Sequence, residues 1–379
     1  MTPRLFRGWM GRLAGGLLLL LVLAVAALAW AWHAWTGPGP GAPAGQPALT
    51  LVNIPTGMTL GAAADTLVGR GLLRDRRVLL AGARLSGQDR QLRAGLYELA
   101  YGSSARQLLT DLTSGLSVQV KVTIPEGLDA ASVAAIVARE MEFPAEAFLA
   151  VADSLVAEAA RGGLLGGAEQ AARHEILLQD ASSAGTRRFH WCEGYLAPDT
   201  YHFSVGTDPA AVAAHLVSTQ FSRLDSLFAA GPVPNGQVGT PHQLLTLASI
   251  VEAEARRDDE RAQVAAVYTN RLAQRWRLEA DPTVAFVLDK KGQRLFYRDL
   301  EVDSPFNTYR NRGLPPGPIG SPGWKSLEAA ASPDTACAAM YFVSDGADGH
   351  VFSRTAREHQ EAVRRFRQVR AQQRRQGER

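Results

Sequence analysis

Apolar residues form one unbroken run near the start of the chain and a periodic pattern from residue 49 onward. Residues 13–32 read LAGGLLLLLVLAVAALAWAW and contain no charged side chain. A run of about 20 apolar residues matches the length of helix that crosses the hydrocarbon of a bilayer. Trp30, Trp32 and Trp35 lie at the C-terminal end of this run, where an aromatic belt would meet the headgroups. The pattern therefore predicts a single transmembrane anchor over residues 13–35.

The charges before this run predict its orientation. Residues 1–12 contain three arginines and no acid, which places them in the cytoplasm and the bulk of the chain outside the cytoplasmic (inner) membrane, in the periplasm or its equivalent. A cleaved signal peptide is the competing interpretation, because it also begins with basic residues. The apolar run is longer than the usual core of a signal peptide and ends in tryptophans. We therefore expect an anchor that is not removed.

Beyond the anchor, residues 36–48 are rich in glycine and proline and read as a linker that lets the rest stand off the bilayer. Residues 49–120 then alternate between period-two and helical patterns, as in a small α+β module. The predicted elements are a strand at 49–54, helices at 60–68 and 76–85, a strand at 96–99, a helix at 105–113 and a strand at 118–125. Such a module is expected to bind glycan or to act as a spacer.

Residues 121–190 are predicted to form a connecting segment that is rich in alanine and helical. Asp129 is placed to cap one helix, and a second helix follows Pro144. The stretch 154–185 contains RGGLLGG and DASSAG and reads as a helical insertion with no assigned chemistry. Together with the module before it and the domain after it, this segment predicts an α+β fold. The length of the chain suggests two or three domains.

A larger α+β domain is predicted over residues 191–371, and its central helix carries a carboxylate. Thr240 and Pro241 form a typical helix start, and the sequence LLTLASIVEAEAR follows at 244–256. Its apolar residues recur at helical spacing. Glu252 lies about 100° from the buried face at Val251, and Glu254 lies about 200° further round. The spacing predicts one acid and not a pair of acids, and Glu254 is expected to form salt bridges or to support the site.

Several loops of this domain combine glycine and proline with polar and aromatic residues, which is a common way to build a site for a polar ligand. The candidates for hydrogen bonds to such a ligand are Asp281, Thr283, Asn307, Tyr309 and His350. Asp281 before a proline is equally typical of a turn. His350 is nearly as well explained by a structural hydrogen bond.

Composition excludes some classes of function. The formal charge is +3, with many arginines in the amphipathic helix expected after Thr355 and in the basic tail 372–379. A solvated face is the default interpretation of that helix, and attraction to anionic lipid or wall polymer, which would weaken with salt, is the alternative. The chain has no nucleic-acid motif and no spacing of ligands that indicates a metal or cofactor. Its two cysteines, Cys192 and Cys337, could form a disulfide in an oxidising compartment, or remain buried thiols.

The phrases of the second half resemble a known family. They are EGYLAPDTY, ASIVEAEA, DPTV, NTY followed by GLPPGPI, SLEAAASP, YFVSDG and GHVF. Together they resemble the YceG-like family of endolytic peptidoglycan (murein) transglycosylases, and the module at 49–120 looks LysM-like. Ala280, Phe306 and Ser321 depart from residues that are common in the family, which leaves the rim of the site less defined.

The resemblance implies cleavage of the β-1,4 bond between N-acetylmuramic acid and N-acetylglucosamine in nascent strands, with a 1,6-anhydro product and no cofactor. It implies that Glu252 is the general acid and base, that residues such as Asp281, Thr283, Asn307, Tyr309 and His350 bind the sugar, and that cell-wall synthases (penicillin-binding proteins) are partners. Two alternatives stay open: a wall-binding scaffold without catalysis that recruits synthases, and a hydrolase that makes reducing ends.

Overall fold

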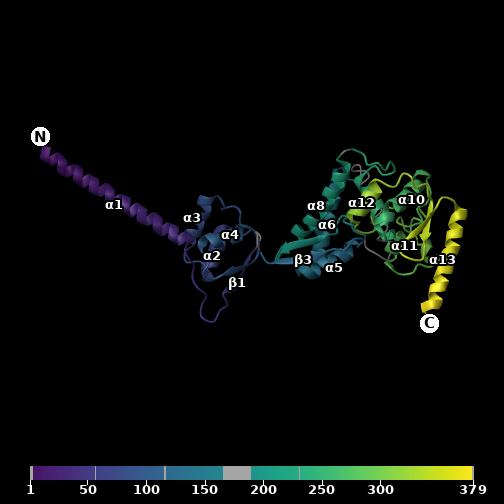
Figure 1. The fold of residues 1–379 in the computed structure, drawn as a ribbon, viewed down its shortest axis with the longest axis horizontal. Helices are drawn as coiled ribbons and strands as arrows, with labels where there is room; N and C mark the ends of the chain where they lie inside the picture. Colours follow the sequence, from purple (N-terminus) through teal and green to yellow (C-terminus); the bar gives the residue numbers. More distant parts are fainter. Residues whose placement is uncertain (1–2, 56, 115–116, 165–188, 230, 378–379) are drawn as a thin grey trace. The chain divides into compact units, whose positions relative to one another are not determined.

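The computed structural model describes residues 3–55, 57–114, 117–164, 189–229 and 231–377 (Figure 1). It is a mixed helix and strand structure, as the sequence predicts. Two compact units are present. The first comprises Met1–Val120 with His202–Thr207, and the second comprises Lys121–Tyr201 with Asp208–Arg379.

Helix α1 (Pro3–Thr36) is the first element of the chain (Figure 1). Its segment Gly16–Thr36 has a mean hydropathy of 2.3 and is, among the described residues, the one helix long and apolar enough to cross a membrane. At its end the ring of Trp35 lies against α3, directly over Gly82, where a Cβ atom would come within 2.1 Å of the ring. A helix that includes the predicted residues 13–35 is therefore present, and its last turn packs on α3.

The first unit contains the elements that its hydrophobic pattern predicts. They are β1 (Leu49–Ile54), α2 (Leu60–Gly69), α3 (Arg76–Ser86), β2 (Gly95–Ala100) and α4 (Ala105–Ser114). Strands β1 and β2 are antiparallel, with Val52 opposite Tyr97. Both side chains are fully buried in a core with leucines of all three helices. The order of strands and helices confirms the prediction of an α+β module, while its LysM-like character stays a prediction.

The glycine- and proline-rich segment at 36–48, which the sequence predicts as a linker, forms hydrogen bonds to the first unit. The Gly39 N–H donates to the carbonyl of Gly102 at 3.0 Å, and the Gly102 N–H donates to the carbonyl of Pro40 at 2.7 Å. A Cβ atom on Gly39 would lie 2.3 Å from the carbonyl oxygen of Ser103, so glycine is needed for this close approach. The segment runs along the surface of the first unit.

Strands β3 (Gln119–Thr123) and β4 (Thr200–Ser204) pair with each other. After β3 come α5 (Ala130–Met141), α6 (Ala145–Ala159) and a short π-helix, η1 (Ala160–Leu164). Asp129 accepts a hydrogen bond from the Ser132 N–H, as the sequence predicts for a helix cap. Residues 165–188 lie outside the described residues, and they include the greater part of the insertion predicted at 154–185.

The rest of the second unit is built from helices and one hairpin. The helices are α8 (Pro209–Phe228), α9 (Pro241–Glu254), η2 (Asp258–Glu260), α10 (Arg261–Ala273), α11 (Asp281–Val287), η3 (Tyr297–Glu301), α12 (Trp324–Ala331) and α13 (Ala356–Gly377). The hairpin joins β5 (Tyr341–Ser344) to β6 (His350–Ser353) in an antiparallel register. Helix α13 packs against this hairpin (Figure 1).

Helix α9 is the centre of this unit and contacts α8, α10, α11 and α12. It begins as predicted: Thr240 Oγ1 accepts from the Gln243 N–H at 3.2 Å, and Pro241 occupies the first turn. The expectation of a single buried face was too narrow, because every residue from Leu244 to Val251 is buried. Neighbouring helices surround α9 until its last turn, which leaves Glu252 and Glu254 at the margin of the core.

Both cysteines are free thiols. Cys192 is buried and Cys337 is half-buried. Burial raises the pKa of the Cys192 thiol well above its ordinary value. Of the two states that the sequence left open, the structure contains the unpaired one.

Candidate active site

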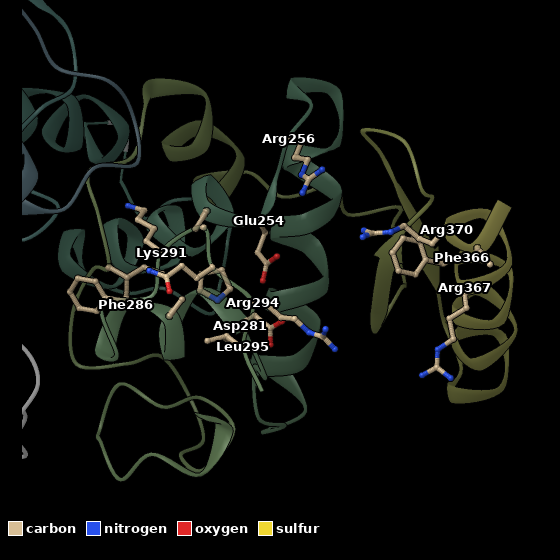
Figure 2. A pocket seen from close by; sticks show the side chains of 17 residues that line it. Glu254, Arg256, Asp281, Phe286, Lys291, Arg294, Leu295, Phe366, Arg367 and Arg370 are labelled. Carbon is tan, nitrogen blue, oxygen red and sulfur yellow. The ribbon is translucent and has the colours of Figure 1, made fainter. Parts of the chain in front are cut away.

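A cleft of about 1250 Å³ opens beside the C-terminal end of α9. Figure 2 shows the carboxylates of Glu254 and Asp281 between the loop that carries Lys291 and Arg294 and the helix that carries Phe366. The cleft is lined by the end of α9, the start of α11, the loop after α11, Ile319 and one face of α13. These segments are far apart in the sequence, so the fold assembles the site.

Glu254, the last residue of α9, is one of two acidic residues that line this cleft. Its Oε1 accepts a hydrogen bond of 3.0 Å from the phenol of Tyr268 on α10. Burial, with a smaller contribution from the charge of Asp281, raises the pKa of Glu254 to about 7, while the Tyr268 hydrogen bond and Arg271 act in the opposite direction. A carboxyl group with this pKa can both donate and accept a proton near neutral pH.

Asp281 and Tyr309 form a second polar pair at the cleft. Asp281 opens α11 and lines the cleft, and its Oδ1 accepts a hydrogen bond of 2.6 Å from the Tyr309 hydroxyl. Burial and the adjacent Asp281 carboxylate raise the pKa of Tyr309 above its ordinary value, so the phenol remains a donor. The sequence proposes both residues for substrate binding, and the structure joins them by this hydrogen bond.

Glu252 faces a different part of the unit. Its Oε1 pairs with Arg261 at 3.1 Å, and its Oε2 accepts from the Gly323 N–H at 3.0 Å. The side chains of Glu252 and Arg261 are 9% and 10% exposed. Glu252 is not among the residues that line the cleft. The sequence predicts correctly that the two glutamates diverge, but the protein itself already occupies both oxygens of the one chosen as the acid.

Glu126 lies close to this ion pair. Burial raises the pKa of Glu126, and the negative charge of Glu252 raises it further. A Cβ atom at position 323 would fall 1.9 Å from Glu126 Oε1, so Gly323 leaves room for that carboxyl group. Arg261 also contacts Asp258 at 3.1 Å. This cluster joins the end of α9 to the segment before α12.

Thr283 and Asn307 are fully buried and hydrogen-bonded within the protein. The Thr283 hydroxyl donates to the carbonyl of Ala280 at 2.8 Å and lies 2.9 Å from the hydroxyl of Thr308. The side-chain amide of Asn307 donates to the carbonyls of Leu300 and Val302, and its Oδ1 accepts from the Tyr309 N–H at 3.0 Å. These contacts fix the loop that presents Tyr309, so the two residues support the site from behind.

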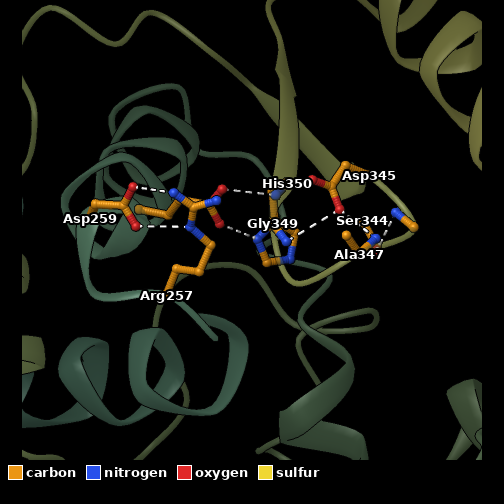
Figure 3. Close-up of polar contacts among 9 residues, drawn as sticks. Arg257, Asp259, Ser344, Asp345, Ala347, Gly349 and His350 are labelled. Carbon is orange, nitrogen blue, oxygen red and sulfur yellow. Dashed lines mark hydrogen bonds and ion pairs between the residues drawn. The ribbon is translucent and has the colours of Figure 1, made fainter.

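His350 stands on β6 and is not among the residues that line the cleft. Its Nδ1 lies 3.0 Å from Glu260 Oε2, and its backbone N–H donates to the other oxygen of Glu260 at 2.9 Å. Figure 3 shows this contact beside the Arg257–Asp259 ion pair and the Asp345 turn of the hairpin. Of the two readings that the sequence gave for His350, this geometry matches the structural hydrogen bond.

The segment before α12 is fixed to α9 by buried hydrogen bonds. Ser249 Oγ accepts from the Ile319 N–H at 3.1 Å. His242 Nε2 donates to the carbonyl of Pro316 at 2.8 Å, so its Nδ1 must accept from the Tyr195 hydroxyl, also at 2.8 Å. Burial lowers the pKa of His242 to about 4 and keeps the ring neutral. The GLPPGPI and EGYLAPDTY phrases thus hold each other and α9 in place.

Sequence reasoning missed the role of Tyr268 and the basic residues of the cleft. Tyr268 is buried on α10, and its hydroxyl reaches Glu254. No spacing between the two residues could show that contact. Among the described residues, no group of three or more histidine, cysteine or acidic side chains is placed to hold a metal.

The cleft thus combines polar loops with the carboxyl group of Glu254, whose pKa is raised by burial. The chain belongs to the YceG-like family, whose model matches residues 52–365. This confirms the resemblance seen in the motifs.

Relatives with assigned names agree with this membership. The chain is similar to the endolytic murein transglycosylase of Bacillus subtilis (strain 168), with 30% identity over 318 residues that cover 83% of this chain and 84% of the relative. The endolytic murein transglycosylase of Streptococcus pneumoniae serotype 2 is 28% identical over 319 residues, which cover 79% of this chain and 55% of that one. A crystal structure of a putative yceG-like protein from Listeria monocytogenes is also similar, with a TM-score of 0.51, 28% identity, and coverage of 83% of this chain and 98% of that one.

Proposed function

We propose that this protein is a membrane-anchored endolytic lytic transglycosylase of murein, and that Glu254 is its general acid and base. It cleaves the β-1,4 bond between N-acetylmuramic acid and N-acetylglucosamine inside nascent glycan strands and so ends their elongation. The observation that carries the proposal is the carboxyl group of Glu254, which lines the cleft with a pKa of about 7. Membership of the family and the names of its relatives support the choice of substrate.

The chemistry needs one acid. Protonated Glu254 gives its proton to the glycosidic oxygen, and the bond from that oxygen to C1 of the muramic sugar breaks. The carboxylate then takes the proton of the C6 hydroxyl on the same sugar while its oxygen bonds to C1, which closes the 1,6-anhydro ring. No water is consumed, and Glu254 ends protonated as it began. A glycosidase with two working carboxylates would need a second free acid at the reacting centre.

The other residues of the cleft support this cycle. Tyr268 donates to Glu254 and holds its orientation. Asp281 raises the pKa of Glu254 through its charge and is itself fixed by Tyr309. Asp281 and Tyr309 are also placed to hydrogen-bond sugar hydroxyls or acetamides at the wall of the cleft.

The location of the enzyme follows from α1. Gly16–Thr36 can span the inner membrane once, and the arginines before it favour an N-terminus in the cytoplasm. The chain after this helix then lies outside the cytoplasm, where nascent strands are made. Cell-wall synthases are the partners expected there, and the first unit is a candidate to bind glycan next to the membrane.

The test compares two variants of equal size on purified sacculi. Glu254→Gln is expected to lower the release of anhydro-ended products by about 10²–10⁴-fold. Glu252→Gln is expected to keep most of the activity but to lose stability, about 3 kcal/mol, because Arg261 is left without this partner in a nearly buried position. Loss of activity in a well-folded Glu252→Gln, with Glu254→Gln still active, would return the acid role to Glu252.

Mass spectrometry of the same digests separates the remaining alternatives. A transglycosylase releases anhydro ends, whereas a hydrolase releases reducing ends that are heavier by one water. If the wild-type chain is a scaffold without catalysis, its digest contains neither kind of product. Thermal unfolding of each variant shows whether a loss of activity reflects chemistry or folding.

A further inference from the structure

The cleft beside Glu254 carries many more positive than negative groups. Its acidic side chains are Glu254 and Asp281. Its basic side chains come from three segments and are Arg256, Lys291, Arg294, Arg367 and Arg370. We call these five residues the cationic wall. Figure 2 shows Arg256, Lys291 and Arg294 on the side of the cleft with Glu254, and Arg367 and Arg370 on the helix opposite.

The guanidinium groups of this wall have no acidic partner among the residues that the structure describes. Within the described part of the chain, none of the four arginines forms an ion pair; Arg294 and Arg370 instead lie over phenylalanine rings at 5.5 and 5.8 Å. Lys291 donates to the carbonyl of Gly127. Elsewhere in the same unit, buried or half-buried basic groups do find acids, as Arg261 does with Glu252 and Lys290 with Asp299.

The arrangement on α13 is specific to one side of that helix. Arg367 and Arg370 are three residues apart, so they share a face, and that face lines the cleft with Phe366. The neighbouring Arg364 and Arg365 are exposed but do not line the cleft. The helix is held in place from the hairpin, where His359 stacks on Tyr341 with ring centres 5.1 Å apart. Residues 367 and 370 lie just after the part of the chain that the family model matches.

Unpaired positive groups that converge on one concave surface repel each other, and an anionic ligand relieves this repulsion. The hydroxyl and acetamide groups of a glycan backbone are neutral, so they do not explain a concentration of positive charge in the cleft. The negative groups of murein are the carboxylates of the peptide stems on its muramic sugars. Planar guanidinium groups bind carboxylates through two parallel hydrogen bonds.

We propose that the cationic wall binds the carboxylates of the peptide stems, so that the cleft selects glycan that still carries its peptides over glycan from which they have been removed. This proposal rests on the proposed function for its substrate, and it adds the feature of the strand that the enzyme recognises. The wall positions the strand and takes no part in the proton transfers of Glu254.

Equilibrium binding of fluorescent glycan strands to the full-length chain in detergent tests this proposal. Two strands of equal length are compared, one with its peptides and one treated with an amidase, and the terminal lipid diphosphate is removed from both. The peptide-bearing strand is expected to bind at least about tenfold more tightly at low salt, and this advantage is expected to shrink as salt rises. Equal affinity for the two strands would overturn the proposal.

Paired variants locate the effect. Arg367→Gln/Arg370→Gln is expected to weaken binding of the peptide-bearing strand by about tenfold and to leave the denuded strand unchanged. Arg364→Gln/Arg365→Gln makes the same change in charge on the same helix outside the cleft and is expected to leave both affinities unchanged. Arg294→Gln tests the opposite side of the cleft and is expected to act like the first pair. Equal losses in the two double variants would show that net charge alone is responsible, which also contradicts the proposal.

Cutting assays on the same strands keep this proposal separate from the proposed function. If neither strand is cut but the peptide-bearing one binds more tightly through Arg367 and Arg370, the wall is correct and the activity is wrong. If both strands are cut at equal rates and bound equally, the activity is correct and the wall is wrong.

Discussion

The phenol of Tyr268 donates a hydrogen bond of 3.0 Å to Glu254, and this contact joins the buried face of α10 to the cleft. Burial raises the pKa of Tyr268 well above its ordinary value, so the phenol stays protonated and remains the hydrogen-bond donor to Glu254. The bond stabilises the charged form of Glu254 and therefore opposes the effect of burial on its pKa. Tyr268 is a positioning residue that also tunes the acid.

Replacement of Tyr268 by phenylalanine should therefore move the pH profile in a definite direction. Catalysis begins from protonated Glu254, so activity is present below its pKa of about 7 and is lost as the pH rises through that value. Tyr268→Phe removes a bond that favours the carboxylate, and the alkaline limb of kcat/KM is expected to move up by about one pH unit.

Tyr297→Phe is the matched control, because Tyr297 is 90% exposed and lies outside the cleft. Its profile is expected to coincide with that of the wild type. A Tyr268→Phe profile that falls in height without moving along the pH axis would indicate a purely structural role.

A second prediction concerns acid stability and the buried ring of His242. Its pKa is about 4 in the folded chain and 6.5 in the ordinary environment. Between these values the unfolded state binds more protons, so the free energy of unfolding falls as the pH drops from 6.5 towards 4. The stabilising contribution of the neutral ring is fully present above pH 6.5. The contribution of this group is at most about 3 kcal/mol.

His242→Gln is expected to lower stability at pH 8, because the Tyr195 and Pro316 hydrogen bonds are disturbed, and to weaken the dependence of stability on pH between 6.5 and 4. Urea unfolding at several pH values measures both effects. His202, which is exposed, provides the control variant His202→Gln. The interpretation fails if His242→Gln and the wild type lose stability in parallel over this range.

A third prediction follows from Gly194, which has φ of +79° and packs against Pro318. A Cβ atom there would lie 2.5 Å from Pro318 Cβ, and the proline ring has little freedom to move. Gly194→Ala is expected to cost about 2–4 kcal/mol from the left-handed backbone and the overlap together. Since Ile319 lines the cleft, activity should fall as well.

Gly206→Ala separates the two causes. Gly206 has a similar φ of +82°, but the nearest atom to its Cβ position is 3.9 Å away. This variant should cost about 1 kcal/mol, from the backbone alone. The role assigned to the overlap with Pro318 would be wrong if both variants melted at the same temperature.

The elements of this fold could be predicted because their causes are local. Alternation of polar and apolar residues located β1 and β2, and Thr240 with Pro241 located the start of α9. The angular separation of Glu252 and Glu254 also followed from helix geometry, and the structure confirms that they face different partners.

The choice between the two glutamates could not be made from periodicity, because it depends on what packs around the end of α9. Arg261 comes from the next helix and Gly323 from the segment before α12, and together they occupy Glu252. Tyr268 and Asp281 create the environment of Glu254 in the same way. Likewise, the arginines of α13 read as a solvated face until the fold places Arg367 and Arg370 on a cleft.

The contact between Trp35 and Gly82 has a mechanical consequence. The apolar helix passes into the first unit without a swivel, because its last turn is already seated on α3. The loop from 37 to 48 leaves that seat and stays bonded to the same unit through Gly39 and Gly102. Extra residues in this loop would therefore not increase the distance between the helix and the rest of the unit. Any tilt of the helix would also tilt the unit.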